Sequence, residues 1–118
     1  MLYTETINKN KDFLFLYKKG KALVGKYAVI YVRPNKKPYN RLGITAGKKV
    51  GNAVHRNRAK RVIRQAYREN EKNVPIGLDI VIVARASICK IKSSDFLAWL
   101  ETSGLNKTEP EAFGEKKK

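Results

Sequence analysis

The segment Leu78–Ala84, with the sequence LDIVIVA, is apolar at six of its seven positions, and most of these residues are β-branched. A strand with one face in water would alternate apolar and polar residues, whereas a continuous apolar run is typical of a strand covered on both faces. Pro75 and Gly77 mark a turn directly before it. The segment therefore predicts the central strand of a sheet, and the rest of the chain has to supply the elements that cover it.

Two further strands are predicted upstream of this segment. Residues 27–33 alternate in character along the chain, and residues 41–47 do the same. The loop between them, residues 34–40, contains two prolines and two lysines. Because this connection is short, the two strands are expected to pair as a hairpin. The residues expected to face the core are Ala28, Ile30 and Val32 on the first strand and Leu42, Ile44 and Ala46 on the second.

Helices are predicted in three places, each preceded by a residue whose side chain can cap a helix N-terminus. The order of elements is then α-β-β-α-β-α, which predicts an α+β domain with two layers. The predicted helices run from Asn8 to about Lys19, from Asn52 to about Asn70, and from Ser93 or Ser94 to Leu100.

The length of 118 residues points to a single domain. Residues 1–101 hold all the predicted elements. From Thr102 onward the residues are small, polar or charged. Residues 102–118 are therefore expected to form a disordered polar tail.

The basic residues are concentrated in one part of the chain. No Asp or Glu occurs between Phe13 and Arg68, and this stretch carries sixteen Lys and Arg residues, a number equal to the net charge of +16. A surface with so much unopposed charge repels itself unless a polyanion neutralises it. Nucleic acid is therefore the expected partner.

The predicted helix that follows Asn52 separates apolar from basic residues. Ala59, Val62, Ile63 and Ala66 have the spacing of a core stripe. Six cations occupy the remaining surface, and five of them are Arg, which forms forked hydrogen bonds with phosphate. No acid lies within reach for i, i+4 pairing with them, so a solvated surface of mixed charge is the less favoured explanation. The six cations are Arg56, Arg58, Lys60, Arg61, Arg64 and Arg68.

Aromatic residues lie close to this charge in the sequence. Phe13 and Tyr17 are four residues apart, so they share one face of the first helix. Tyr31 lies on the strand face opposite to the expected core face. All three can simply belong to the core, but Tyr31 is also free to line an accessible groove. Aromatic rings beside cations suit single-stranded nucleic acid, because unpaired bases stack on them.

The sequence offers little for catalysis by the chain itself. The basic stretch lacks the clustered carboxylates of a metal-dependent nuclease, and one His and one Cys cannot form a zinc site. His55 is expected to pack beside the apolar stripe, and Cys89 to act as a small apolar residue. No apolar stretch is long enough to span a membrane, and the first residues lack the apolar core of a signal peptide. A cytoplasmic protein without membrane contact is expected.

The run Val50–Arg68, VGNAVHRNRAKRVIRQAYR, strongly resembles the protein subunit of bacterial ribonuclease P. The hallmark of that family is an Arg-Asn-Arg box on a basic helix. It is matched here by Arg56, Asn57 and Arg58, and followed by Lys60, Arg61 and Arg64. The resemblance begins at residues 10–20, continues through the predicted strands, and fades in the last helix and the tail.

This resemblance implies both a fold and a function. The fold would be an α/β sandwich with a left-handed βαβ crossover, similar to domains of a small-subunit ribosomal protein and of elongation factor G. The protein would assist a catalytic RNA that removes the 5′ leader of precursor tRNA. Mg²⁺ would be held mainly by RNA, with no catalytic or metal-binding residue in the protein and no obligate protein partner. The residues implied to contact the RNA subunit are Lys48, Lys49, Asn52, Arg56, Asn57, Arg58, Lys60, Arg61, Arg64 and Arg68, and those implied to contact the leader are Lys11, Phe13, Tyr17 and Tyr31.

Three other functions are compatible with a small basic domain. A ribosomal or other structural RNA-binding protein would have the same charge, and would co-purify with ribosomes. A sequence-specific DNA-binding protein would use the basic helix for recognition, but the sequence shows no helix-turn-helix partner and no dimer surface. A protein nuclease would cleave precursor tRNA without any RNA subunit. The RNA that co-purifies with the chain distinguishes among these functions.

Overall fold

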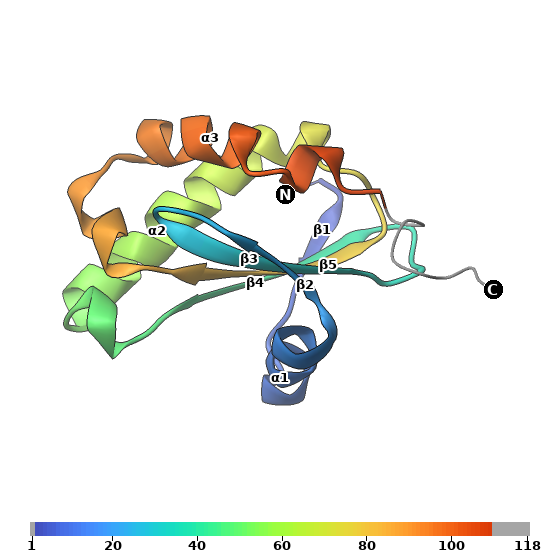
Figure 1. Ribbon diagram of the computed structural model, residues 1–118, viewed down its shortest axis with the longest axis horizontal. Helices are drawn as coiled ribbons and strands as arrows, with labels where there is room; N and C mark the ends of the chain where they lie inside the picture. Colours follow the sequence, from blue (N-terminus) through green and yellow to red (C-terminus); the bar gives the residue numbers. More distant parts are fainter. Residues whose placement is uncertain (1, 110–118) are drawn as a thin grey trace.

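The computed structural model describes residues 2–109 and consists of one five-stranded sheet with helices on both faces (Figure 1). Helices α2 and α3 lie together on one face, and α1 lies on the other. The helices and strands are β1 (Thr4–Thr6), α1 (Asn10–Lys19), β2 (Lys21–Val24), β3 (Ala28–Pro34), β4 (Asn40–Ala46), α2 (Ala53–Asn70), β5 (Leu78–Ala84) and α3 (Ser93–Thr102). Short 3-10 helices are η1 (Lys48–Val50), η2 (Glu71–Asn73), η3 (Ala86–Lys90) and η4 (Leu105–Lys107).

Strand β5 is the middle strand of the sheet, as its composition predicts. The strand order is β1-β4-β5-β3-β2. Leu78, Ile80, Val81 and Ile82 have no exposed surface, so both faces of β5 are covered. β5 pairs in parallel with β4 and antiparallel with β3. The segments β4, α2 and β5 therefore form a βαβ unit within the mixed α+β fold.

The prediction that β3 and β4 form a hairpin is wrong. β5 lies between them and pairs with both. The loop that joins β3 to β4 crosses the start of β5, where the amide of Asn35 donates to the carbonyl of Gly77 at 2.8 Å. β3 forms its hairpin with β2 instead, from the Lys21–Val32 pair to the Val24–Val29 pair. Loop length cannot reveal that a segment from later in the chain enters between two strands.

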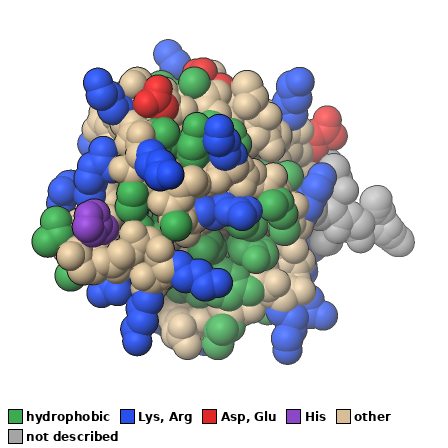
Figure 2. All heavy atoms as spheres, turned by 60° about the vertical axis from the view of Figure 1, so that its left-hand side comes forward, with side chains coloured by type: hydrophobic (Ala, Val, Ile, Leu, Met, Phe, Trp, Pro, Cys, Tyr) green, Lys and Arg blue, Asp and Glu red, His purple; other side chains and the backbone are tan. Residues whose placement is uncertain are grey.

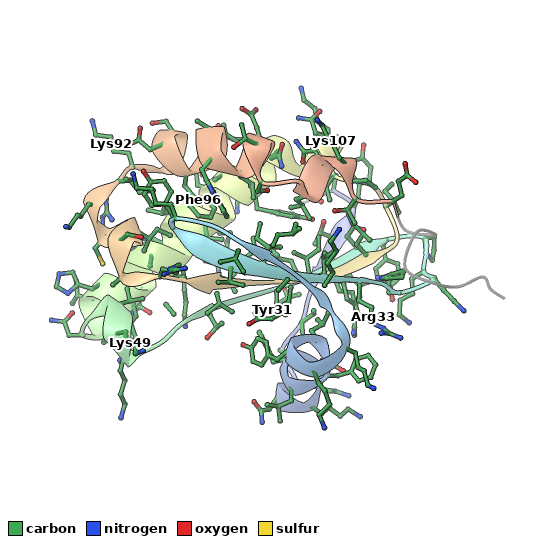
Figure 3. All side chains as sticks on the ribbon, in the orientation of Figure 1. Tyr31, Arg33, Lys49, Lys92, Phe96 and Lys107 are labelled. Atoms are coloured by element: carbon green, nitrogen blue, oxygen red, sulfur yellow. The ribbon has the colours of Figure 1, made fainter. Side chains whose placement is uncertain are left out.

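The main core lies between the sheet and the α2–α3 layer. The predicted inward residues of β3 are fully buried, and Leu42 and Ala46 of β4 are buried as well. The predicted stripe of α2 packs onto this sheet face. Phe96 and Leu100 of α3 complete the layer, and Phe96 points toward the sheet in Figure 3. The residues of the α2 stripe are Ala59, Val62, Ile63 and Ala66, joined by Tyr67.

Helix α1 crosses the opposite face of the sheet and forms a second, smaller core. Leu16 packs with Ile7 and Val81 there. Phe13 lies directly over Gly43 of β4, where a Cβ atom would come within 2.6 Å of the Phe13 ring. The missing side chain at Gly43 is thus what allows α1 to approach the sheet at this point.

The helix starts agree with the sequence to different degrees. The Asn52 side chain caps α2 as predicted, because its Oδ1 accepts a hydrogen bond from the amide of His55 at 3.1 Å. Helix α1 begins at Asn10 rather than Asn8, and Lys9 precedes it without a side-chain cap. At α3 the residue before the helix is Lys92, whose amide donates to Asp95 Oδ2 at 3.1 Å.

The folded region extends beyond residue 101, where the tail was predicted to begin. Leu105 has no exposed surface and belongs to the main core. The side-chain amides of Asn70 and Asn106 exchange two hydrogen bonds, of 2.8 and 3.0 Å, and so fasten η4 to the end of α2. The remainder of the predicted tail, residues 110–118, lies outside the described residues.

Candidate nucleic-acid interface

The cations of α2 are spread around the three sides of the helix that do not face the core. Arg61, Arg64 and Arg68 are exposed, as is Asn57, whereas Arg56, Arg58 and Lys60 are half-buried along the flanks. Within residues 2–109, no carboxylate pairs with any of these cations. The helix therefore presents positive charge that nothing in the described part of the chain neutralises.

Two of the guanidinium groups also form hydrogen bonds with backbone carbonyls of the protein. Arg58 Nη2 donates to the carbonyl of Ile91 at 3.0 Å, in the segment that leads into α3. Arg56 Nη1 donates to the carbonyl of Gly51 at 3.4 Å, just before the helix. An Arg side chain has five N–H donors, so each of these residues keeps donors for an external acceptor. Their side chains are nonetheless oriented by the protein, unlike the free side chains of Arg61 and Arg64.

The start of α2 is shaped by a tight contact between Gly51 and His55. Gly51 has a φ of 139°, a conformation that favours glycine, and a Cβ atom there would lie 2.9 Å from the His55 side chain. His55 is exposed, so the prediction that it packs beside the apolar stripe is wrong. Just upstream, Val50 is buried and its carbonyl accepts from Cys89 Sγ at 3.2 Å. This anchor leaves Lys48 and Lys49 of η1 exposed.

An aromatic surface lies on the sheet face that α1 only partly covers. Its centre is the pair Tyr17 and Tyr31, whose rings are 5.0 Å apart and inclined by 65°. Tyr17 is 38% exposed, Tyr31 is half-buried, and Phe13 extends this surface along α1. Burial raises the pKa of the Tyr17 hydroxyl, and the neighbouring Tyr31 raises it further. The pair thus offers neutral aromatic surface that is open to solvent.

A separate, basic cavity of about 640 Å³ lies between η1, the end of β5 and the turn before β3. Val83, which faces the same side of the sheet as Tyr31, lies on its floor. In Figure 3, Tyr31 points toward α1, and Lys49 lies on the same side of the sheet at its far end. The charged side chains that line the cavity are Lys26, Lys48, Lys49 and Arg85.

Sequence reasoning did not identify Lys26 and Arg85 as site residues. They are far apart in the chain, and strand pairing brings them together: the amide of Arg85 donates to the carbonyl of Tyr27 at 2.9 Å, and Arg85 Nη1 donates to the carbonyl of Gly25 at 3.2 Å. Lys26 lies before β3 and Arg85 follows β5, and both strands were predicted. The antiparallel pairing of β3 with β5 was not predicted, so the sequence did not show that these two cations lie close together.

Lys11 lies apart from the aromatic pair. It is exposed near the N-terminal end of α1 and lines a different cavity, of about 270 Å³, together with Asp12 and Arg41. Arg41 is engaged there by carboxylates, at 2.9 Å from Asp79 and 3.7 Å from Asp12. This region is therefore mixed in charge, unlike the basic cavity lined by Lys26, Lys48, Lys49 and Arg85.

The surface as a whole segregates charge. Figure 2 shows the side of the molecule on which η1 and the start of α2 lie. Lys and Arg side chains surround a patch of hydrophobic side chains, and Asp and Glu stand at the margin. This combination of apolar surface and surrounding cations suits a single-stranded nucleic acid better than a small anion.

Among residues 2–109, no three His, Cys, Asp or Glu side chains come together as a group that could hold a metal ion. None of the helices in this part of the chain is long and apolar enough to cross a membrane.

Comparison with known proteins gives a consistent result. The family model described as Ribonuclease P matches residues 1–107. The chain is similar to proteins named "Ribonuclease P protein component" from Clostridioides difficile, with 47% identity over 71% of this chain and 75% of the relative. A protein of the same name from Lachnoclostridium phytofermentans shows 49% identity over 70% of this chain and 72% of the relative.

Solved structures resemble the fold over nearly its full length. The RNase P protein of Thermotoga maritima matches with a TM-score of 0.79 and 33% identity, covering 89% of this chain and 98% of that protein. The RNase P protein of Staphylococcus aureus matches with a TM-score of 0.75 and 34% identity, covering 92% of this chain and 97% of that protein.

Proposed function

The chain belongs to the ribonuclease P protein family, which makes it a protein subunit of that ribonucleoprotein endoribonuclease, and we propose that it contacts RNA through two separate surfaces. The first, the helix surface, comprises the exposed cations of α2 together with η1, and binds the catalytic RNA subunit. The second, the leader cleft, is lined by Phe13, Tyr17 and Tyr31, and binds the 5′ leader of precursor tRNA. The family match does not favour the alternative of a ribosomal protein.

The helix surface is supported by its free positive charge. Arg61, Arg64 and Arg68 have no carboxylate partner in the described chain and extend into solvent. Each phosphate that such a side chain neutralises releases condensed counterions from the RNA, which favours binding at moderate salt. Lys48, Lys49 and Asn52 lie directly before this helix and extend the same surface.

The observation that carries the leader cleft is the exposed Tyr17–Tyr31 pair on the same sheet face as Val83, which lines the basic cavity. Unpaired bases stack on aromatic rings with little sequence preference, and in our proposal Lys26 and Arg85 of that cavity neutralise phosphates of the same strand. A double helix offers no free base face for such a pair. The 5′ leader is the single-stranded part of the substrate, and it is our proposed occupant.

In this proposal the protein contributes binding, and the RNA subunit contributes the chemistry. The chain lowers the repulsion between closely packed phosphates of the RNA subunit and the leader, and so favours the geometry in which cleavage occurs. We further propose that the Mg²⁺ ions of the holoenzyme are held mainly by RNA, and that the complex acts in the cytoplasm.

The leader cleft is tested with Tyr31→Ala in the reconstituted holoenzyme. Loss of one stacked base costs about 1–3 kcal/mol, which corresponds to a roughly 5- to 150-fold weaker Kd for precursor tRNA. The Kd for mature tRNA, which lacks the leader, is expected to remain unchanged.

Phe15→Ala serves as the matched control. Phe15 is a half-exposed ring on the same helix as Tyr17, but it packs against Arg33 at 5.0 Å rather than against Tyr31. Its removal should leave both affinities unchanged. An equal loss for precursor and mature tRNA with Tyr31→Ala, or no loss for either, would remove Tyr31 from the leader cleft.

A further inference from the structure

Glu71 is a buried acid in a strongly basic chain, and it binds the opposite end of the sequence. It follows α2 directly and is 4% exposed. One carboxylate oxygen accepts from the amide of Leu2 at 2.9 Å. The other accepts from the amide of Tyr3 at 2.8 Å and from the Thr4 hydroxyl at 2.6 Å. Three donors from the segment that begins β1 therefore converge on one side chain.

The Thr4 hydroxyl of this segment also contacts a buried group of α2. Tyr67 of α2 has no exposed surface, and its hydroxyl lies 3.0 Å from Thr4 Oγ1. A buried carboxylate that loses its donors pays a desolvation cost that nothing offsets, so this arrangement strongly favours a single position for the N-terminal segment. The position is defined relative to the end of α2.

Strand β1 has few other contacts to hold it. It is three residues long, and Glu5 and Thr6 are exposed. It lies at the edge of the sheet and pairs in parallel with β4 alone. Burial of its own side chains therefore contributes little, and the bonds to Glu71 are a large share of what fixes it.

The position of β1 also determines where α1 begins. Only residues 7–9 separate the two elements. Ile7, the first of them, is buried with Leu16 of α1 in the smaller core, and its amide donates to the carbonyl of Leu42 at 2.8 Å. A shift of β1 would therefore move α1, and with it the ring of Phe13 over Gly43 and the Tyr17–Tyr31 pair.

We propose that Glu71 is a positioning residue for the leader cleft: its carboxylate holds β1, and through β1 it holds α1 where Phe13 covers Gly43 and Tyr17 contacts Tyr31. The inference rests on the proposed function of that cleft. Glu71 directly follows α2, and the exposed side of α2 belongs to the helix surface. The end of this helix therefore fixes the position of the leader cleft. The two RNA-facing surfaces are thus joined through one hydrogen-bonded carboxylate.

The test uses Glu71→Gln, with Glu69→Gln as the matched control. The amide nitrogen of glutamine cannot accept a hydrogen bond, so at least one donor of β1 loses its partner. Glu69 lies two residues earlier, is exposed, and bonds only to the Gln65 side chain among the described residues, at 2.6 Å. Both variants change the charge equally, so any general electrostatic effect on RNA affinity is common to them.

In the reconstituted holoenzyme, Glu71→Gln should weaken precursor tRNA binding while the Kd values for mature tRNA and for the RNA subunit stay equal to those of Glu69→Gln. If the competent arrangement of the cleft falls to one tenth of the population, Kd for the precursor rises about tenfold. Thr4→Val retains the carboxylate and both amide donors, and should give a smaller loss in the same direction. It also keeps the test valid if Glu71→Gln does not fold.

Tyr31→Ala, measured in parallel, separates failure of this inference from failure of the leader cleft. If Tyr31→Ala weakens precursor binding and neither Glu71→Gln nor Thr4→Val does, the positioning role is overturned and the cleft stands. If the Glu71 variant weakens RNA-subunit and mature tRNA binding as much as precursor binding, Glu71 supports the fold in general and the inference is overturned as well. If none of the three variants affects precursor binding, the cleft itself is refuted, and the inference with it.

Discussion

At the scale of single residues, the Arg side chains of α2 are not equivalent. Arg64 is exposed and makes no described contact with a carboxylate or carbonyl, whereas Arg58 is half-buried and donates to the carbonyl of Ile91. From the sequence alone, both were predicted as cations that contact RNA, because both lie off the apolar stripe of α2. The backbone carbonyl that Arg58 contacts belongs to a segment more than thirty residues away in the sequence. The sequence pattern around Arg58 therefore could not predict this hydrogen bond.

Substitutions at these two positions should therefore differ. Arg64→Glu should weaken binding of the RNA subunit while the melting temperature of the isolated protein stays within about 2 °C of the wild type, since exposed substitutions usually change stability by under about 0.5 kcal/mol. Arg58→Glu should weaken binding and also lower the melting temperature, because the Ile91 carbonyl loses a charged donor. Circular dichroism and a binding titration on the same preparations check both. A larger thermal loss for Arg64→Glu than for Arg58→Glu would contradict this assignment.

Glu71 gives a prediction about pH. Burial acts to raise the pKa of its carboxyl, but hydrogen bonds from the Thr4 hydroxyl and the amides of Leu2 and Tyr3 outweigh it, so the pKa lies below its ordinary value of 4.5. Because the folded-state pKa is depressed, the stabilisation is fully present above the unfolded-state pKa and is lost as pH falls through the folded-state value. The difference in unfolding free energy between wild type and Glu71→Gln should be constant near neutral pH and shrink below about pH 4.5. A difference that persists undiminished at pH 2 would show that ionisation of Glu71 plays no part.

At the scale of elements, the parts that were predicted correctly are those with strong local patterns. β5 was identified by its continuous apolar run, and α2 by its stripe and its Asn52 cap. β1 and β2 were missed, because TET and KALV have no periodicity and exist as strands through their pairing with β4 and β3. The same holds for the candidate site. The cations of α2 were predicted from the sequence, whereas the basic cavity with Lys26 and Arg85 depends on the order of the strands in the sheet.

The contact between α1 and the sheet gives a prediction at this scale. Gly43→Ala would place a Cβ atom 2.6 Å from the Phe13 ring, so the ring must move. We expect a loss of about 1–3 kcal/mol in the free energy of unfolding, as for other overpacked cores. In a Phe13→Leu background the same change should cost much less, because the atoms that clash are gone. Chemical denaturation of the four proteins measures this coupling, and equal costs in both backgrounds would show that α1 does not approach the sheet at Gly43.

At the scale of the whole molecule, the net charge of +16 acts on stability and on binding in opposite directions. Salt screens the repulsion among the unpaired cations, so the melting temperature of the isolated protein should rise between low and moderate ionic strength. The affinity for RNA should fall over the same range, with a log–log slope of about −0.7 or steeper per phosphate contact, and so beyond about −3 for several contacts. A flat binding response to salt would contradict the electrostatic part of the proposal.

The central claim is that one small domain binds two RNAs, the catalytic RNA subunit and the leader of precursor tRNA, through two different surfaces. The most direct measurement is a two-by-two comparison of Arg64→Glu and Tyr31→Ala, each assayed for affinity to the RNA subunit and for the ratio of precursor to mature tRNA affinity in the assembled holoenzyme. Arg64→Glu should weaken RNA-subunit binding and leave the ratio unchanged. Tyr31→Ala should lower the ratio by about tenfold and leave RNA-subunit binding unchanged. If both variants weaken both quantities in proportion, the helix surface and the leader cleft are one site, and the two-surface account is wrong.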